Sequence, residues 1–326
     1  MDFLGIDLAK LTFDATLLSE QGAMHYHAFP NTSEGFQALE AWLTAGGVSE
    51  LHACMEATNI YWEALATFLY QKGFTVSVVN PARIKGYAMA TMQRNKTDKL
   101  DSAIIAAFCK THHPTAWQPA SEAHKRLRAL TRHRDDLLQT RLQQQNRLRD
   151  TTDSLVQESL QTVLETIEGQ LEALEQAIKE HVAAHEELRT NLELLTAIVG
   201  IGVVTGCKLL SEFGEIEQYE TAKALAADAG LTPSQYESGT SVRRRARLSK
   251  VGKASIRAAL YFPAITAMRR CEGIKAFAER LAARGKPKKV IICAVMRKLL
   301  HIVYGVLKHR TPYDPAKVLG HTGATT

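Results

Sequence analysis

The apolar residues of this chain change their spacing at about residue 120, and that change limits the folds open to it. Before it, short runs rich in β-branched and aromatic residues, such as FLGIDL and LTFDATLL, alternate with helical patterns. After it, apolar residues recur three and four positions apart, without proline, until about residue 195. We therefore expect three regions: an α/β domain over residues 1–118, an α-helical coiled coil over residues 119–195, and a mainly α-helical domain over residues 196–326.

The first region predicts a mixed β-sheet. Three strand signals come first, followed by a helix, a strand, a helix, a strand and a last helix that begins near residue 98. This order is typical of an α/β layer. In such folds the side chains that follow the carboxyl ends of the strands form the sites.

The middle region carries a seam of apolar residues with heptad spacing, which predicts an antiparallel or dimeric coiled coil. Two histidines fall on this seam as an HxxxH pair, and we expect them to pack there rather than to bind zinc. The seam consists of Leu164, Ile167, Leu171, Leu174, Ile178, His181, His185, Leu188, Leu192 and Leu195.

Composition excludes several classes of protein. No apolar run approaches the roughly 18 residues that span a bilayer, and the first residues lack the basic and apolar segments of a secretion signal. The five cysteines are scattered, without a CxxC motif. This usage argues against a zinc ribbon or a disulfide framework and is typical of a reducing cytoplasm.

Charge is divided unevenly along the chain. Residues 231–310 hold 19 Lys and Arg against three Asp and Glu, a net charge of +16, whereas the whole chain carries +6. One region therefore supplies nearly all the attraction for a polyanion, which indicates a nucleic-acid partner.

The basic residues form clusters that we expect to contact the phosphate backbone, in a salt-sensitive way and without reading sequence. Taken alone, each cluster is equally consistent with a solvated surface. The candidate nucleic-acid-binding residues are Arg94, Lys96, Arg243, Arg244, Arg245, Arg247, Lys250, Lys253, Lys286, Lys288 and Lys289.

Four acidic residues suggest a metal site. Asp98 and Asp101 lie three apart, on one face of the expected helix and about 5–6 Å from each other, although acids at a helix start are also favoured by the helix dipole alone. Asp7 and Glu56 each end an apolar strand, where a carboxylate is costly unless it is paired. Four carboxylates without His or Cys suit Mg²⁺, or Mn²⁺, and nucleases use two such ions about 4 Å apart on a phosphodiester.

Several stretches resemble the DEDD-type insertion-sequence transposases, which are also described as bridge-RNA-guided serine recombinases. These stretches are GIDLAK, MEATNIYWEALA, VNPARIKGYA and RNKTDKLDSAIIAAFC. The resemblance implies an α/β ribonuclease H-like (RuvC-like) N-terminal domain in which Asp7, Glu56, Asp98 and Asp101 are the catalytic and metal-binding acids.

A second signature, AGLTPSQYESG in residues 229–239, is similar to the transposase domain of the same family. By resemblance, Ser238 is the covalent nucleophile. From the residues alone, a turn serine is the favoured explanation of this position, and Ser234, Ser241 and Ser249 are equal candidates for a nucleophile. The chain departs from the family pattern at Asn59 and Ser102, where glycine and alanine are usual, and neither change removes a ligand.

The resemblance implies an RNA-guided DNA recombinase of an insertion sequence. In that scheme Ser238 attacks a DNA phosphodiester with help from Mg²⁺, and strands are exchanged between double-stranded donor and target DNA. A structured guide (bridge) RNA supplies specificity. The homo-oligomer is a dimer that assembles to a tetramer, in which the acidic domain of one subunit pairs with the serine domain of another. The setting is the bacterial cytoplasm, with the protein on the nucleoid when active.

Two alternatives remain from the residues alone. A metal-dependent Holliday-junction-type endonuclease would need the four acids but not Ser238. A non-enzymatic nucleic-acid-binding scaffold would tolerate Asp98→Asn without loss of function.

Overall fold

The computed structural model describes residues 1–57, 61–92, 97–214, 216–238, 242–249 and 251–315, and of residues 235–238 and 242–246 it describes the backbone alone. The chain divides into two compact units, residues 1–119 and 120–326. The regions expected to form the coiled coil and the C-terminal domain lie together in the second unit. The N-terminal region is the mixed α/β unit that the strand and helix signals predict.

The N-terminal unit is built on a five-stranded sheet in the order β3-β2-β1-β4-β5. Strands β1, β2 and β3 form an antiparallel meander, and β4 and β5 continue the sheet parallel to β1. This arrangement is compatible with a ribonuclease H-like fold. Its elements are β1 (Asp2–Leu8), β2 (Thr12–Leu18), β3 (Met24–Pro30), α1 (Ser33–Ala45), β4 (Leu51–Glu56), α2 (Trp62–Gln71), β5 (Thr75–Val79), α3 (Pro81–Ala90) and α4 (Asp98–His112).

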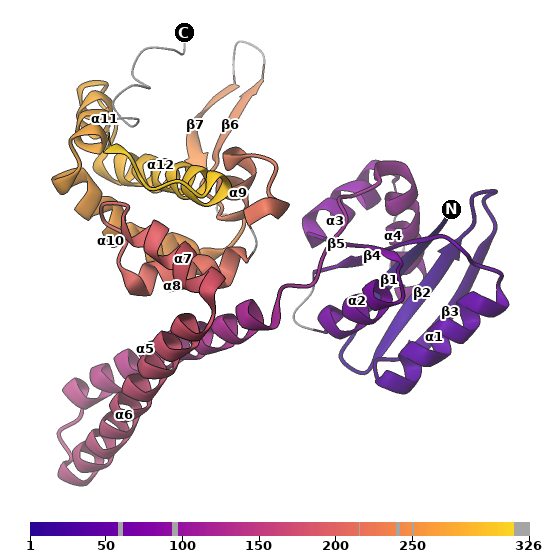
Figure 1. The fold of residues 1–326 in the computed structure, drawn as a ribbon, viewed down its shortest axis with the longest axis horizontal. Helices are drawn as coiled ribbons and strands as arrows, with labels where there is room; N and C mark the ends of the chain where they lie inside the picture. The colour runs from indigo at the N-terminus through magenta and orange to yellow at the C-terminus, as the bar shows by residue number, and fades with distance from the viewer. Residues whose placement is uncertain (58–60, 93–96, 215, 239–241, 250, 316–326) are drawn as a thin grey trace. The chain divides into compact units, whose positions relative to one another are not determined.

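Helices cover both faces of this sheet (Figure 1). Alternate strand residues such as Leu4 and Ile6 pack under α1 and α2, whereas Phe3 and Cys54 pack under α3 and α4. Helix α3 was absent from the sequence expectation. It begins where the Asn80 side chain accepts a hydrogen bond from the backbone of Ala82, with a proline at its first position.

Helix α4 lies directly against strand β1, and Gly5 makes this possible. A Cβ atom added at Gly5 would lie 2.1 Å from the backbone oxygen of Ser102 and 2.2 Å from the backbone nitrogen of Ala106. One hydrogen bond fixes the contact, since the Thr16 and Ser102 hydroxyls are 2.8 Å apart and buried. Any side chain at position 5 would therefore push the helix off the sheet.

The C-terminal unit is mainly helical. Its elements are α5 (Glu122–Asp150), α6 (Ser154–Ala184), α7 (Glu186–Thr196), α8 (Val203–Phe213), the short helix η1 (Ile216–Gln218), α9 (Ala222–Asp228), β6 (Pro233–Ser238), β7 (Val242–Leu248), α10 (Ala254–Arg270), α11 (Glu272–Ala283) and α12 (Lys288–His309).

Helices α5 and α6 form an antiparallel hairpin in which seam residues of α6, such as Leu171 and Ile178, are buried. The expected continuous seam is wrong at His185, where the backbone is extended and α6 ends. The His181 ring bonds the Ala123 carbonyl at 2.8 Å, next to the start of α5, so α5 does not face the seam beyond this point, where α7 packs on α8 and α12 instead. The two histidines pack together, as expected. A coiled coil between subunits stays a prediction.

Helices α7, α9, α10 and α11 and the short helix η1 pack around α12. This is the one described helix that is long and apolar enough to cross a membrane, yet half of its apolar window is buried inside the unit, and Val295, Leu299 and Val303 are fully enclosed. We therefore treat it as a core helix. The five cysteines are free thiols.

Strands β6 and β7 pair antiparallel within a region that the sequence predicted to be mainly α-helical. The strand signal is hidden because VRRRARL consists largely of arginine and lacks the apolar alternation that marks a half-buried strand.

We predict that Gly5→Ala lowers the free energy of unfolding by about 1–3 kcal/mol, because the new methyl group overlaps the α4 backbone. Urea denaturation measures this. The matched control is Gly86→Ala in α3, where an added Cβ meets nothing within 4 Å; it should be neutral or stabilising by up to about 1 kcal/mol. Equal stability of the two variants would show that the close packing of α4 on β1 is wrong.

Candidate functional site

The strand register places Asp7 and Glu56 on one face of the sheet. In the parallel pairing of β1 with β4, Gly5 is opposite Cys54, and Asp7 and Glu56 each follow two residues later. Side chains on a strand alternate between faces, so the two acids lie on the same face as Gly5 and Cys54, which is the face that α4 covers. Both are half-buried at the carboxyl ends of their strands.

The start of α4 lies over the same edge. Near the far end of the helix, the rings of His113 and Phe3 are 5.5 Å apart, so α4 runs opposite to β1. Its first turn, which holds Asp98 and Asp101, therefore lies toward the end of β1 that carries Asp7. The Thr97 side chain caps this turn by accepting a hydrogen bond from the backbone of Leu100.

The fold thus brings the four predicted acids to one edge and one face of the N-terminal unit. They come from three elements far apart in the sequence: β1, β4 and α4. Their carboxylates do not form a finished metal cage: within the described residues, no group of three or more His, Cys, Asp or Glu is placed to hold an ion.

Sequence reasoning missed two residues at this edge, Asp14 and Tyr26. Asp14 is directly opposite Asp7 in the antiparallel pairing of β1 with β2, and so shares its face. The Tyr26 hydroxyl on β3 donates a hydrogen bond to the Asp14 carboxylate. The Lys99 ammonium of α4 lies 5.2 Å from the centre of the Tyr26 ring, a cation–π contact that joins α4 to β3.

The electrostatics of Tyr26 reflect this crowding of acids. Its hydrogen bond to Asp14, its burial, and the charges of Asp14 and Asp98 together raise the pKa of Tyr26 to about 12. The phenol therefore stays protonated at neutral pH and keeps donating to Asp14. The relation of Asp14 to Asp7 depends on the register in which β1 pairs with β2, which the sequence did not predict.

The chemistry of the donor set fits a hard divalent cation. Asp7, Glu56, Asp98 and Asp101 offer only carboxylate oxygens, which Mg²⁺ and Mn²⁺ prefer. Binding an ion would require these side chains to converge more closely than they do here.

The serine lies in the other unit. Ser238 is the last residue of β6, and its backbone pairs with Val242 of β7. The predicted contacts Arg243, Arg244 and Arg245 lie on β7, and like Ser238 they are described by their backbone alone. Three further predicted contacts fall outside the described residues: Arg94, Lys96 and Lys250.

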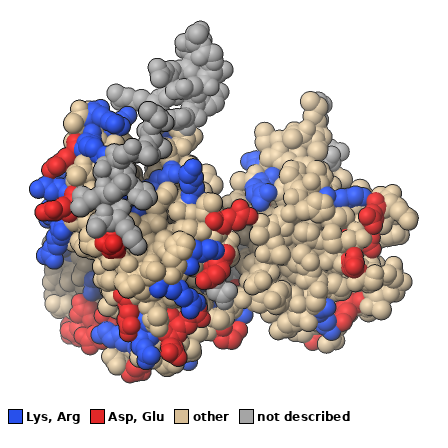
Figure 2. Space-filling view, turned by 45° about the horizontal axis from the view of Figure 1, so that its top comes forward, with Lys and Arg blue, Asp and Glu red and all other residues tan. Residues whose placement is uncertain are grey.

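The remaining predicted contacts divide into two kinds. Arg247, Lys286, Lys288 and Lys289 are exposed. On the visible face of the C-terminal unit, Lys and Arg are interspersed with Asp and Glu (Figure 2). Lys253 instead has internal partners, and its contact with nucleic acid stays a prediction.

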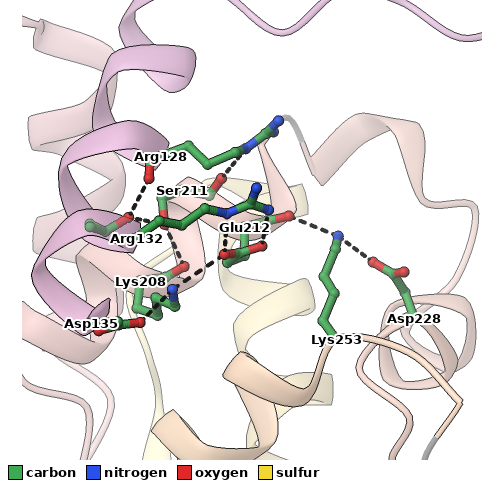
Figure 3. A network of polar contacts seen from close by, with 9 residues as sticks. Arg128, Arg132, Asp135, Lys208, Ser211, Glu212, Asp228 and Lys253 are labelled. Atoms are coloured by element: carbon green, nitrogen blue, oxygen red, sulfur yellow. Dashed lines mark hydrogen bonds and ion pairs between the residues drawn. The ribbon is translucent and has the colours of Figure 1, made fainter. Parts of the chain in front are cut away.

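A polar network lies at the base of the β6–β7 ribbon (Figure 3). The Lys253 ammonium, between β7 and α10, is 2.6 Å from the Asp228 carboxylate at the end of α9. It also donates to the Glu212 carbonyl of α8 at 2.8 Å. Gly252 is forced into a positive φ of 130° with no room for a Cβ atom. These contacts fix where the ribbon leaves the helices.

The network extends through the Glu212 side chain, which is buried. Arg132 of α5 donates two hydrogen bonds to this carboxylate, both of 3.0 Å, and Lys208 lies 3.3 Å away. Lys208 also pairs with Asp135 at 2.7 Å. Burial alone would raise the pKa of Glu212, but the hydrogen bonds and charges of Arg132 and Lys208 outweigh burial and lower the pKa to about 2.

Folding lowers the pKa of Glu212 from 4.5 to about 2. Its ionised carboxylate therefore stabilises the folded protein at pH values above 4.5, and this contribution is lost as the pH falls toward about 2. We predict that Glu212→Gln reduces the loss of unfolding free energy between pH 7 and pH 3. Urea denaturation at both pH values measures this, with Glu279→Gln at an exposed position of α11 as the control. An unchanged pH dependence in Glu212→Gln would contradict the ionised, paired state of this carboxylate.

Comparison with known proteins matches both units. A DEDD-type IS110 transposase model covers residues 4–157, and the model described as "Transposase IS116/IS110/IS902 family" covers residues 192–279. The chain is 33% identical to the pilin gene-inverting protein of Moraxella bovis, over 96% of this chain and 97% of that protein. It is 23% identical to the transposase for insertion sequence element IS1111A of Coxiella burnetii, over 95% and 90% of the two chains.

Proposed function

The chain belongs to the IS110/IS116/IS902 family of transposases, and from this premise we propose that it is an RNA-guided DNA recombinase that cleaves with Ser238. The relative from Moraxella bovis is named for inverting a pilin gene, and the relative from Coxiella burnetii for transposing an insertion sequence. Inversion and transposition both need DNA strands to be cut and rejoined, and our proposal concerns that shared step.

The observation that carries the proposal is the placement of Asp7, Glu56, Asp98 and Asp101 at one sheet edge. Asp98 is exposed and the other three acids are half-buried, and gathering like charges at one edge favours the binding of a cation or a proton there. Such an arrangement suits a recombinase, because carboxylates can hold the divalent cations that assist reactions of phosphodiesters. When bound, Mg²⁺ would withdraw charge from the attacked phosphate and the leaving oxygen.

In the proposed reaction, each phosphorus–oxygen bond that breaks is replaced by a new one, so no external energy source is needed. The Ser238 oxygen attacks phosphorus, one phosphorus–oxygen bond forms and the bond to the 3′-oxygen breaks. The hydroxyl proton of the serine is balanced by the proton gained at the 3′-oxygen. The free 3′-hydroxyl then attacks the phosphoserine of the partner strand, which rejoins DNA and releases the serine.

The proposed partners are double-stranded donor and target DNA and a structured guide RNA, in the bacterial cytoplasm. Base pairing would supply specificity while the protein grips backbone and shape. Exchange between two duplexes needs an even number of subunits, so we propose a dimer that forms a tetramer. Support comes from the α5–α6 hairpin, which exposes Leu142 to 58% and Leu155 to 74%, as expected of a surface that a second copy covers.

The test uses purified protein, candidate RNA, Mg²⁺ and labelled DNA that carries a nick to trap intermediates. We predict a protein–DNA band on a denaturing gel for the wild type. Ser238→Ala should abolish this band because the nucleophile is gone. Asp98→Asn should weaken the band by at least about 100-fold, since removing one group that stabilises charge in a transition state typically costs about 10²–10³-fold in rate.

Ser234→Ala is the matched control, because Ser234 lies on the same strand and should leave the band intact. Cleavage without a covalent band, surviving Ser238→Ala, would overturn the serine mechanism and identify a hydrolytic junction endonuclease. Full activity of Asp98→Asn would overturn the role of the acidic edge.

A further inference from the structure

The C-terminal unit contains a second basic feature, separate from the arginines of β7. A groove with a volume of about 770 Å³ lies beside Lys253, but its cations are paired with acids. Another groove, of about 740 Å³, runs along α12 and is closed by Phe277 of α11 and by residues 311–314. Arg297, His301, Gly305 and His309 line it at intervals of four residues, which places them on one stripe of α12.

The lining of this α12 groove includes two cations of α12, Arg297 and Lys298, and one acid, Asp314. Arg297 and Lys298 are half-buried, and neither forms an ion pair with any acid that the structure describes. Lys298 instead lies 5.4 Å from the centre of the Phe277 ring, which Arg280 also approaches at 5.9 Å. Burial and then the charge of Arg280 lower the pKa of Lys298. Several like charges are therefore held close together and partly out of water, which is unfavourable unless an anion joins them.

His301 adds a polar side chain to the lining of the same groove. Its Nε2 atom is shielded from water and has no hydrogen-bond partner in the described structure. Burial, and then the charges of Arg297, Lys298 and Lys223, lower the pKa of His301. A buried polar atom without a partner is rare in proteins, and a bound ion or water can supply that partner. Gly305 leaves the stripe open, since an added Cβ there meets nothing within 4 Å.

We infer that the α12 groove binds the phosphate groups of a nucleic-acid strand, through Arg297 and Lys298 with His301 as an additional hydrogen-bonding group. This inference rests on the proposed function, which makes nucleic acid the protein's polyanionic partner. It adds a binding surface on a helix that the basic clusters in the sequence did not reveal. DNA and RNA share the phosphodiester chemistry that such a groove recognises.

The test measures binding of full-length protein to labelled duplex DNA and to a labelled RNA hairpin by fluorescence anisotropy, over a series of salt concentrations. The double variant Arg297→Ala/Lys298→Ala should lower the affinity for nucleic acid. Near 0.15 M salt, we expect a loss of roughly fivefold for each phosphate that the variant no longer neutralises. On duplex DNA it should also reduce the slope of log affinity against log salt by about 0.9 for each such phosphate.

The charge-matched control is Lys275→Ala/Lys308→Ala, at two exposed lysines of α11 and α12 outside the groove. The charge-preserving variant Arg297→Lys/Lys298→Arg should retain most of the wild-type slope. Gly305→Leu fills the groove without removing charge and should also weaken binding, while thermal unfolding confirms that each variant is folded.

A larger effect of the groove variants than of the control on either nucleic acid supports the inference, and the affected arm identifies DNA or RNA. Equal effects of groove and control variants in both arms overturn it while the proposed function stands. If these variants instead lose self-association, the groove belongs to an acidic protein surface, which also overturns the inference. Wild-type protein that binds neither nucleic acid would overturn the proposed function as well.

Discussion

The contact between the Gly5 backbone and helix α4 determines where the acidic residues of the N-terminal unit lie. With 2.1 Å between an imagined Cβ atom and the Ser102 carbonyl, only glycine lets the helix approach this closely. The approach sets the height of the first turn of α4 above the sheet, and with it the positions of Asp98 and Asp101 relative to Asp7. The Thr16–Ser102 hydrogen bond fixes the helix against sliding along the strand. At position 102 the chain departs from the family pattern, and the serine hydroxyl finds a buried partner there.

In the C-terminal unit, a polar two-stranded ribbon is held on a helical core. Its anchor combines two ion pairs, Lys253 with Asp228 and Arg132 with Glu212, with the packing of Leu248 against the apolar core. Buried ion pairs add little net stability compared with apolar groups, but removing one partner is costly. Such a network therefore favours one arrangement of the ribbon. In the described part of the α12 groove the cations have no such partners, and this contrast is what marks the groove as a binding surface.

Much of the N-terminal fold could be predicted from sequence because its strands and helices carry clear apolar periodicity and capping residues. Asp7 and Glu56 stood out as charges at the ends of apolar strands. Asp14 did not, because its relation to Asp7 depends on the register of a hairpin rather than on spacing in the chain. The break at His185 also escaped prediction, since the heptad spacing continues through it while the partner helix does not.

The C-terminal unit was harder to predict for a physical reason. Strand β7 of its ribbon is rich in arginine and carries no apolar pattern, and the ion pair of Glu212 with Arg132 joins residues 80 positions apart. The α12 groove is lined by residues of α9, α11 and α12 and by residues 311–314, so no short sequence motif predicts it.

Divalent-cation binding by Asp7, Glu56, Asp98 and Asp101 at the edge of the sheet is the property on which the proposed chemistry depends. Anomalous X-ray diffraction from crystals of the protein grown with Mn²⁺ and nucleic acid tests it directly. We predict one or two anomalous peaks within about 2.5 Å of carboxylate oxygens from at least three of the four acids, the range of Mn²⁺-type oxygen coordination. Well-ordered acids with no peak between them, or Mn²⁺ bound only elsewhere, would contradict it.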